Sequence, residues 1–122
     1  MMVECMVVGA GGFIGAVLRY VIGLIPLREG GAFPVKTFLI NILGSFVIGM
    51  IAALALKNDT CNPRTVLFLK VGICGGFTTF SSFALETGDL VREGNARVAL
   101  LYAVLSVATG VIAVFAGQKL IR

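Results

Sequence analysis

Four long apolar stretches decide what this chain can fold into. They cover residues 3–27, 37–56, 64–85 and 98–121. Each is close to the ~20 residues that an α-helix needs to cross the ~30 Å hydrocarbon core of a bilayer. The whole sequence is 58% hydrophobic and 13% charged, whereas soluble domains are about 45–50% apolar. The sequence therefore predicts an all-α membrane protein with four transmembrane helices, which form a single domain over residues 1–122.

Basic residues are divided evenly between the two sides of this predicted bundle. On one side are Lys57, Arg64, Lys70, Lys119 and Arg122, and on the other are Arg19, Arg28, Lys36, Arg92 and Arg97. An excess of Lys and Arg normally marks the cytoplasmic side of a membrane protein. Because neither side has an excess, we expect insertion in both orientations and pairing of opposite copies as an antiparallel, dual-topology dimer. A single orientation fixed by other signals is the alternative.

Small residues spaced four apart occur in three of the spans. The pairs are Gly11 and Gly15, Ser45 and Gly49, and Ala113 and Gly117. Such pairs let helix backbones approach closely, and they would serve either packing within the chain or contact between two copies. Because side chains fill the middle of a four-helix bundle, a pathway for a solute would form more easily between subunits than within one.

The third apolar stretch concentrates glycines and hydroxyl groups. The glycines are Gly72, Gly75 and Gly76, and the hydroxyl residues that follow are Thr78, Thr79, Ser81 and Ser82. Glycine allows backbone conformations that other residues avoid, and irregular backbone at this depth has to be buried in protein or face a watery cavity. We therefore predict a third helix broken near its centre, around Gly75 and Gly76. The freed carbonyls would hold a Na⁺ or K⁺ ion or be closed by protein contacts alone.

Neutral polar groups and aromatic rings lie on neighbouring faces. Asn41, Gly44 and Ser45 form a stripe along the second span, and Phe80 and Phe83 share one face of the third. The edge of a phenylalanine ring is electropositive. Ring edges and the Asn41 amide would thus attract a small anion without trapping it, as conduction requires. Packing against lipid or another helix is the simpler interpretation of each residue taken alone.

Other functions are disfavoured by what the sequence lacks. It contains no histidine, and neither a nucleophile with its base nor a zinc-binding pattern is present, so we expect no enzyme. The three cysteines are interpreted as small apolar residues. The basic residues are scattered rather than clustered, which predicts no nucleic-acid partner. Glu4, Glu86 and Asp89 lie near the ends of predicted spans, where we expect them to be exposed.

Three segments are distinctive in combination: GAVLRY at residues 15–20, FLINILGSFVIG at 38–49 and GICGGFTTFSSF at 72–83. Together with the four spans they make the chain resemble the Fluc (CrcB) family of prokaryotic fluoride channels. The resemblance implies an antiparallel, dual-topology homodimer with two fluoride pores and a central, structural Na⁺ at the subunit interface. It also implies a multi-pass protein of the prokaryotic inner membrane.

The resemblance implies roles for individual residues. Those that match the fluoride pore are Asn41, Phe80, Phe83, Ser81, Tyr102 and Ser106. The backbone carbonyls of Gly75 and Thr78 match the central Na⁺ site. Arg19 matches an arginine that draws anions into an aqueous vestibule, and a snorkelling anchor at the membrane interface is its alternative role.

The implied function is passive, fluoride-selective efflux that lowers cytoplasmic fluoride. Its partners are the fluoride ion, a second copy of the chain and membrane lipid. Two other classes remain open on the residues alone. A small multidrug exporter of dual orientation would need a deep carboxylate, and Glu4 is the only acid in the first span. A structural subunit of a larger complex would use the polar residues only to join helices.

Overall fold

The computed structural model describes residues 1–27 and 31–121, and every regular element in these ranges is helical. Three of the predicted spans are continuous helices: α1 (Met2–Gly23), α2 (Val35–Lys57) and α6 (Ala96–Ile121). The third span consists of α3 (Pro63–Leu67), a π-helical segment η1 (Phe68–Cys74), α4 (Gly75–Phe77) and α5 (Phe80–Arg92). Two residues of the charge tally, Arg28 and Arg122, lie outside the described residues.

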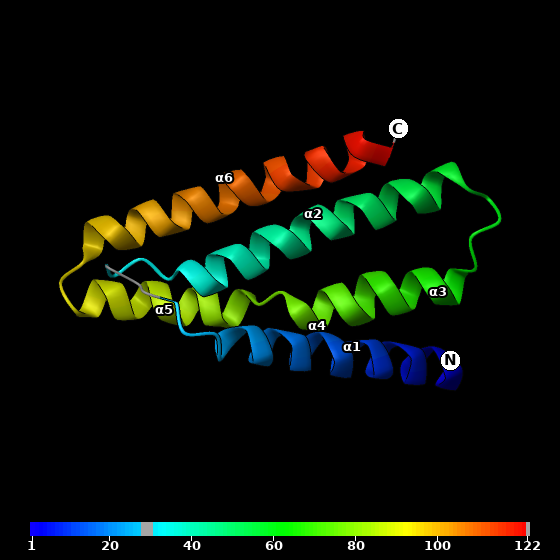
Figure 1. The fold of residues 1–122 in the computed structure, drawn as a ribbon, viewed down its shortest axis with the longest axis horizontal. Coiled ribbons are helices and arrows are strands. Elements are labelled where there is room, and N and C mark those ends of the chain that lie inside the picture. The colour runs from blue at the N-terminus through cyan, green and yellow to red at the C-terminus, as the bar shows by residue number, and fades with distance from the viewer. Residues whose placement is uncertain (28–30, 122) are drawn as a thin grey trace.

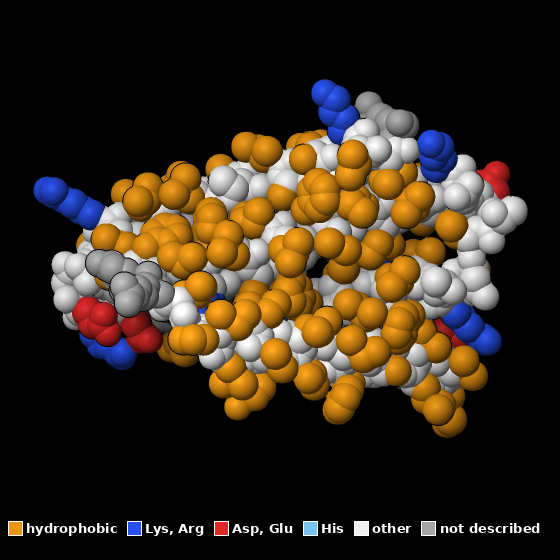
Figure 2. All heavy atoms as spheres, viewed as in Figure 1, with side chains coloured by type: hydrophobic (Ala, Val, Ile, Leu, Met, Phe, Trp, Pro, Cys, Tyr) orange, Lys and Arg blue, Asp and Glu red, His pale blue; other side chains and the backbone are white. Residues whose placement is uncertain are grey.

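Successive spans run in opposite directions, so both ends of the chain lie at the same end of the bundle (Figure 1). Apolar side chains cover the middle of the visible face, and charged side chains gather near its two ends (Figure 2). Four helices in the described part of the chain are long and apolar enough to cross a membrane. The prediction of an all-helical membrane protein with four long apolar spans is confirmed.

Backbone contact through glycines joins α1 to the first half of the third span. A Cβ atom on Gly76 would lie 2.6 Å from the carbonyl oxygen of Gly12, and one on Gly15 would overlap the carbonyl oxygen of Ile73. Real Cβ atoms do not approach backbone atoms so closely. The contact therefore depends on the missing side chains, as in other close helix pairs of membrane proteins.

A second glycine contact joins α2 to α6. A Cβ atom on Gly49 would overlap the carbonyl oxygen of Val114, and one on Gly117 would overlap that of Phe46. Of the two uses open to the small-residue pairs, packing within the chain is the one that these glycines serve. The first half of the third span packs against α1, whereas α5, its second half, packs against α6. The two halves therefore contact different helices.

The third span breaks at Thr78 and Thr79, beyond the position predicted from the glycines. Gly75 is helical, with φ −63° and ψ −37°, whereas Thr78 (ψ 158°) and Thr79 (ψ 115°) are extended. The prediction of a central break is confirmed, but its placement at Gly75 and Gly76 is wrong. Gly76 serves close approach to α1, and the helix unwinds where hydroxyl side chains can replace the lost backbone bonds. The π-helical segment before the break was not predicted.

We expect Gly15→Ala to lower the free energy of unfolding by about 2 kcal/mol, because the added methyl group meets backbone that has to move and overpacking usually costs ~1–3 kcal/mol. The matched control is Gly9→Ala, since a Cβ atom there meets nothing within 4 Å. Alanine is more stable than glycine in a helix by about 0.8–1.0 kcal/mol, so this control should be neutral or stabilising. Unfolding in detergent micelles, followed by circular dichroism, measures both. Equal effects of the two substitutions would contradict the packing described for Gly15.

Candidate functional site

Asn41 on α2 holds the broken backbone of the third span. Its Oδ1 accepts the Thr79 N–H at 2.8 Å, and its Nδ2 donates to the Thr79 carbonyl at 3.0 Å. Thr79 is only 9% exposed, and an unsatisfied backbone group inside a membrane is strongly unfavourable. One side chain therefore gives the Thr79 N–H a partner in place of the helical one that the break removes, and it binds the Thr79 carbonyl as well. The second hydrogen of the Asn41 amide stays available for a ligand.

Hydroxyl groups complete the two helix ends at the break. Thr79 Oγ1 accepts the Ser82 N–H at 3.1 Å and so forms the N-cap of α5, a position that threonine favours. Thr78 Oγ1 donates to the Cys74 carbonyl at 2.9 Å, alongside the Thr78 N–H at 3.0 Å. These bonds explain why two adjacent threonines, rather than the glycines, mark the unwound residues.

The backbone carbonyls of Gly75 and Thr78 are among those that lose their usual donors at the break. In a continuous helix the Gly75 carbonyl would accept the Thr79 N–H, and the Thr78 carbonyl would accept the Ser82 N–H. These N–H groups bond Asn41 Oδ1 and Thr79 Oγ1 instead. Freed carbonyls of a broken helix suit a small monovalent cation. No group of three or more His, Cys, Asp or Glu side chains that could hold a metal occurs among residues 1–27 and 31–121. Carbonyl oxygens are the kind of donor that fits Na⁺, the ion predicted for Gly75 and Thr78.

A groove with a volume of about 340 Å³ lies beside the break. We call it the polar groove, and its lining residues are Asn41, Gly44, Ser45, Ile48, Cys74, Thr78, Thr79, Phe80, Phe83, Ser106 and Val107. It brings together four of the six residues predicted for the pore: Asn41, Phe80, Phe83 and Ser106. The Ser106 hydroxyl oxygen is buried and has no hydrogen-bond partner in the described part of the chain. The groove thus offers neutral donors and carries no ionised side chain.

The two phenylalanines of the groove differ in exposure. Phe80 is 78% exposed, whereas Phe83 is half-buried. Their ring centroids are 5.8 Å apart with an interplanar angle of 53°. Phe83 also packs edge-to-face against Tyr102 at 5.0 Å. One ring is therefore fixed within the chain, and the other stands at the open side of the groove.

Tyr102, the fifth predicted pore residue, lies next to the polar groove and is fully buried. Its hydroxyl donates to Glu86 Oε1 at 2.8 Å, and the Thr37 hydroxyl donates to Glu86 Oε2 at 2.7 Å. The expectation that Glu86 is an exposed helix-end carboxylate is wrong. It is half-buried, because hydroxyl groups from α2 and α6 satisfy both of its oxygens. The sequence carried a signal for this contact, since Thr37 extends the Asn41 stripe by one helical turn.

A second cleft, with a volume of about 610 Å³, also borders the break. We call it the vestibule, and its lining residues are Ala16, Arg19, Tyr20, Gly23, Leu24, Pro34, Lys36, Thr37, Ile40, Thr79, Ser82 and Glu86. Arg19 Nε donates to the Gly76 carbonyl at 3.3 Å, and Lys36 Nζ donates to the Gly23 carbonyl at 2.9 Å. Thr79 lines both the vestibule and the polar groove. The break therefore stands where a cleft with two cations meets a neutral groove.

Ser81, the last of the predicted pore residues, lies outside both clefts. It is exposed, and its Oγ is 3.4 Å from Thr79 Oγ1. Sequence reasoning assigned no separate role to Thr79, although Thr79 is the point where all these contacts converge. Its position as the first residue before a new helical turn is the signal that could have singled it out.

Four apolar helices, a clamped break in the third and a neutral, open groove beside it indicate a multi-pass helical membrane protein with a polar site near the middle of its third span. Residues 6–118 match the family model described as CrcB-like protein, Camphor Resistance (CrcB). The chain belongs to the CrcB-like family. This confirms the resemblance drawn from the three sequence segments.

Relatives of the chain match it over nearly their whole length. The fluoride-specific ion channel FluC of Chlorobaculum tepidum is 46% identical over 121 residues, covering 99% of this chain and 96% of that protein. The protein of the same name from Azobacteroides pseudotrichonymphae is 42% identical, covering 98% and 97%. That of Rhizobium meliloti is 44% identical, covering 96% and 94%.

We expect Asn41→Leu, which keeps the volume of the side chain but removes both bonds to Thr79, to lower the free energy of unfolding by about 2–4 kcal/mol. Each buried backbone group left without a partner costs ~1–3 kcal/mol. Ser45→Ala is the control, because Ser45 lines the same groove and its hydroxyl makes no bond to the break among the described residues. Its effect should be about 0.5 kcal/mol or less. Chemical denaturation in micelles distinguishes the two, and a mild effect of Asn41→Leu would argue against the clamp.

Proposed function

We propose that this protein is a fluoride channel that lets fluoride leave the cell passively through the polar groove. The observation that carries the proposal is the meeting of the vestibule and the polar groove at Thr79. A cationic cleft that leads to a row of neutral donors suits a small anion. The relatives named fluoride-specific ion channel FluC support fluoride as that anion.

The vestibule raises the local concentration of anions. Arg19 and Lys36 place two positive charges in a cleft with low-dielectric walls, which focuses the electric field. Both cations donate to backbone carbonyls, so they are held in position rather than extended into water. Glu86 lies in the same cleft, and the hydroxyls of Thr37 and Tyr102 that bond it partly offset its negative charge.

The polar groove replaces water around the ion with weak donors. The free N–H of Asn41, the unpartnered Ser106 hydroxyl and the electropositive ring edge of Phe80 lie along it. Neutral donors attract an anion without the strong binding that would stop conduction. Because no proton carrier or nucleotide site is needed for such passage, we propose electrodiffusion, with efflux set by the fluoride gradient and the membrane potential.

A second copy of the chain in the opposite orientation would close the groove. Phe80 is 78% exposed, and the groove is open along the surface that carries it. The basic residues give no preference for one orientation. We therefore propose an antiparallel, dual-topology homodimer in the inner membrane of a prokaryote, with a pathway built along each groove.

We propose a structural Na⁺ held by the carbonyls of Gly75 and Thr78 where the breaks of the two copies meet. Support comes from the diversion of both helical donors to Asn41 and Thr79. When bound, the ion would supply a fixed positive charge at the centre of the dimer. The chain's own contribution is to orient the carbonyls through the Asn41 clamp.

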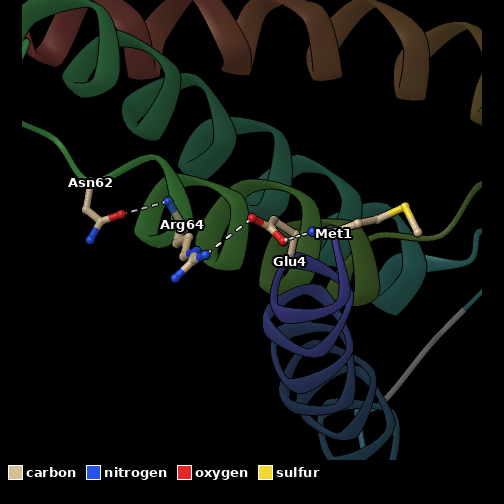
Figure 3. Close-up of polar contacts among 4 residues, drawn as sticks. All are labelled: Met1, Glu4, Asn62 and Arg64. Carbon is tan, nitrogen blue, oxygen red and sulfur yellow. Dashed lines mark hydrogen bonds and ion pairs between the residues drawn. The ribbon is translucent and has the colours of Figure 1, made fainter.

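A proton-coupled exporter of cationic drugs fits the structure less well. Glu4 lies at the end of α1, where its carboxylate is 3.5 Å from Arg64 Nη2 (Figure 3). Its side chain is 40% exposed, so it does not face a deep binding site. Glu86 is deeper, but both of its oxygens accept hydroxyl bonds. An exporter needs a carboxylate that is free to exchange protons and drug.

Fluoride release from liposomes that contain the purified protein tests the proposed function. We expect fast release of fluoride, read with a fluoride electrode, and no release of chloride in a parallel experiment. Phe80→Ile should slow fluoride at least about tenfold, since losing ~1.4 kcal/mol of site stabilisation has that effect on a rate. Phe115→Ile is the matched control, because Phe115 is 65% exposed on α6 and does not line the groove.

Three outcomes separate the proposals. Absence of fluoride release from liposomes that contain well-reconstituted wild-type protein would overturn the proposed channel function. It would favour a role as a subunit of a larger complex. Equal rates for the Phe80 and Phe115 variants would remove Phe80 from the pathway. Replacing Na⁺ with N-methylglucamine on both sides should slow wild-type release, and an unchanged rate would argue against the structural Na⁺ alone.

Reporter fusions to the C-terminus test dual orientation. A cytoplasmic fluorescent reporter and a periplasmic phosphatase should both be active in the wild-type protein. Removing two charges from one side with Arg92→Gln and Arg97→Gln should shift nearly all copies to one orientation, because the rule depends on the difference in Lys and Arg between sides. The fluoride rate should fall with it. Activity of only one reporter in the wild type would contradict the antiparallel dimer.

A further inference from the structure

We infer that Arg19 is a positioning residue for the break, acting through its Nε–H on the Gly76 carbonyl and not through its charge alone. The effect that we expect on fluoride transport rests on the proposed function. The structural basis of the inference is a hydrogen bond of 3.3 Å between residues 57 positions apart. The bond joins α1 to α4, the short helix that ends at the break.

The Gly76 carbonyl needs such a donor because the helix ends beside it. Its partner in a continuous helix would be the Phe80 N–H, which lies beyond the two extended residues of the break. The last carbonyls of a helix require partners from outside it. At the middle of a span such a donor has to come from the protein or from water in a cavity, and here the structure places the Arg19 Nε–H on the carbonyl. Arg19 supplies the donor that water would supply elsewhere.

The position of Arg19 on α1 favours this role over a snorkelling anchor. Gly11, Gly15 and Arg19 are spaced four apart and share one face, and this is the face that contacts the third span. The Arg19 side chain is half-buried and extends along that contact toward Gly76. An interface anchor would instead point its charged end away from the protein interior.

The same arrangement recurs at two other helix ends. Lys36 Nζ donates to the carbonyl of Gly23, the last residue of α1. Lys57 Nζ donates to the carbonyl of Ile121, the last residue of α6, at 3.1 Å. A cation at a helix C-terminus is favourable both as a hydrogen-bond donor and through the helix dipole. Arg19 differs from the two lysines because its helix end lies inside the bundle, between the carbonyls of Gly75 and Thr78.

Two substitutions separate the hydrogen bond from the charge. Arg19→Gln places a side-chain N–H on Cδ, where arginine carries Nε–H, and removes the charge. Arg19→Lys keeps the charge but places a methylene group on Cδ. Arg19→Met removes both, and Lys36→Met removes the other cation of the vestibule, which bonds the Gly23 carbonyl and none of the carbonyls at the break. Each is made in the full chain.

Amide hydrogen exchange of residues 77–83 in micelles reads the geometry of the break without any transport. We expect Arg19→Lys and Arg19→Met to speed exchange about tenfold, the factor that one net hydrogen bond of ~1.4 kcal/mol provides. Arg19→Gln and Lys36→Met should match the wild type. Gel filtration shows first that all four variants remain folded and of unchanged size.

Fluoride release at two salt concentrations reads the charge. At ~0.01 M salt, where charges act over ~30 Å, Arg19→Gln and Lys36→Met should both be slower than the wild type. At ~1 M salt, where the range is ~3 Å, these two should recover, whereas Arg19→Lys and Arg19→Met should stay slow. The positioning role would be overturned if amide exchange were fast in Arg19→Gln and normal in Arg19→Lys, so that it followed the charge and not the N–H group. Equal exchange rates in all variants would overturn it as well. Absence of fluoride release from every protein would overturn the proposed function, and the exchange pattern would still decide the role of Arg19.

Discussion

A helix that is interrupted inside a membrane must find partners for its backbone groups within the protein, and this constraint shapes the centre of the molecule. Asn41 satisfies both the N–H and the carbonyl of Thr79, and the Thr79 hydroxyl starts the next helix. These bonds are what allow two extended residues to persist between α4 and α5. The polar groove and the vestibule both border Thr79, so the site exists because the break is stabilised.

Much of the fold could be predicted from the sequence, because the bilayer imposes a length and a polarity on each span. The four apolar stretches became four long helices, and the interrupted third span followed from its glycines and hydroxyls. The exact residues of the break could not be predicted, because glycine favours both unwinding and close packing. Gly76 faces Gly12 across a gap too small for a Cβ atom, and only the position of α1 reveals which use applies.

Most residues of the candidate site could be predicted from the sequence, but their hydrogen-bond partners could be predicted less well. Asn41, Phe80, Phe83 and Ser106 do share one groove, because helical spacing on two spans places them on facing surfaces. Glu86 was misjudged, since its position next to the end of the predicted span suggested exposure, whereas two hydroxyls from other helices bond it. A side chain whose partners come from different helices gives no local pattern in the sequence.

The two glycine contacts also determine when the fold can be completed. Each joins helices that are not neighbours in the chain, α1 with the third span and α2 with α6, and the bonds beside them link residues 57 and 64 positions apart. Contacts between distant residues form only after the intervening chain is in place. Because the spans are synthesised in order, the glycine face of α1 stays uncovered until the third span is made, and that of α2 stays uncovered until α6 is made. The contact between α2 and α6 can form only after α6 has been synthesised, and a chain truncated before α6 would expose the glycine face of α2 and become a substrate for degradation.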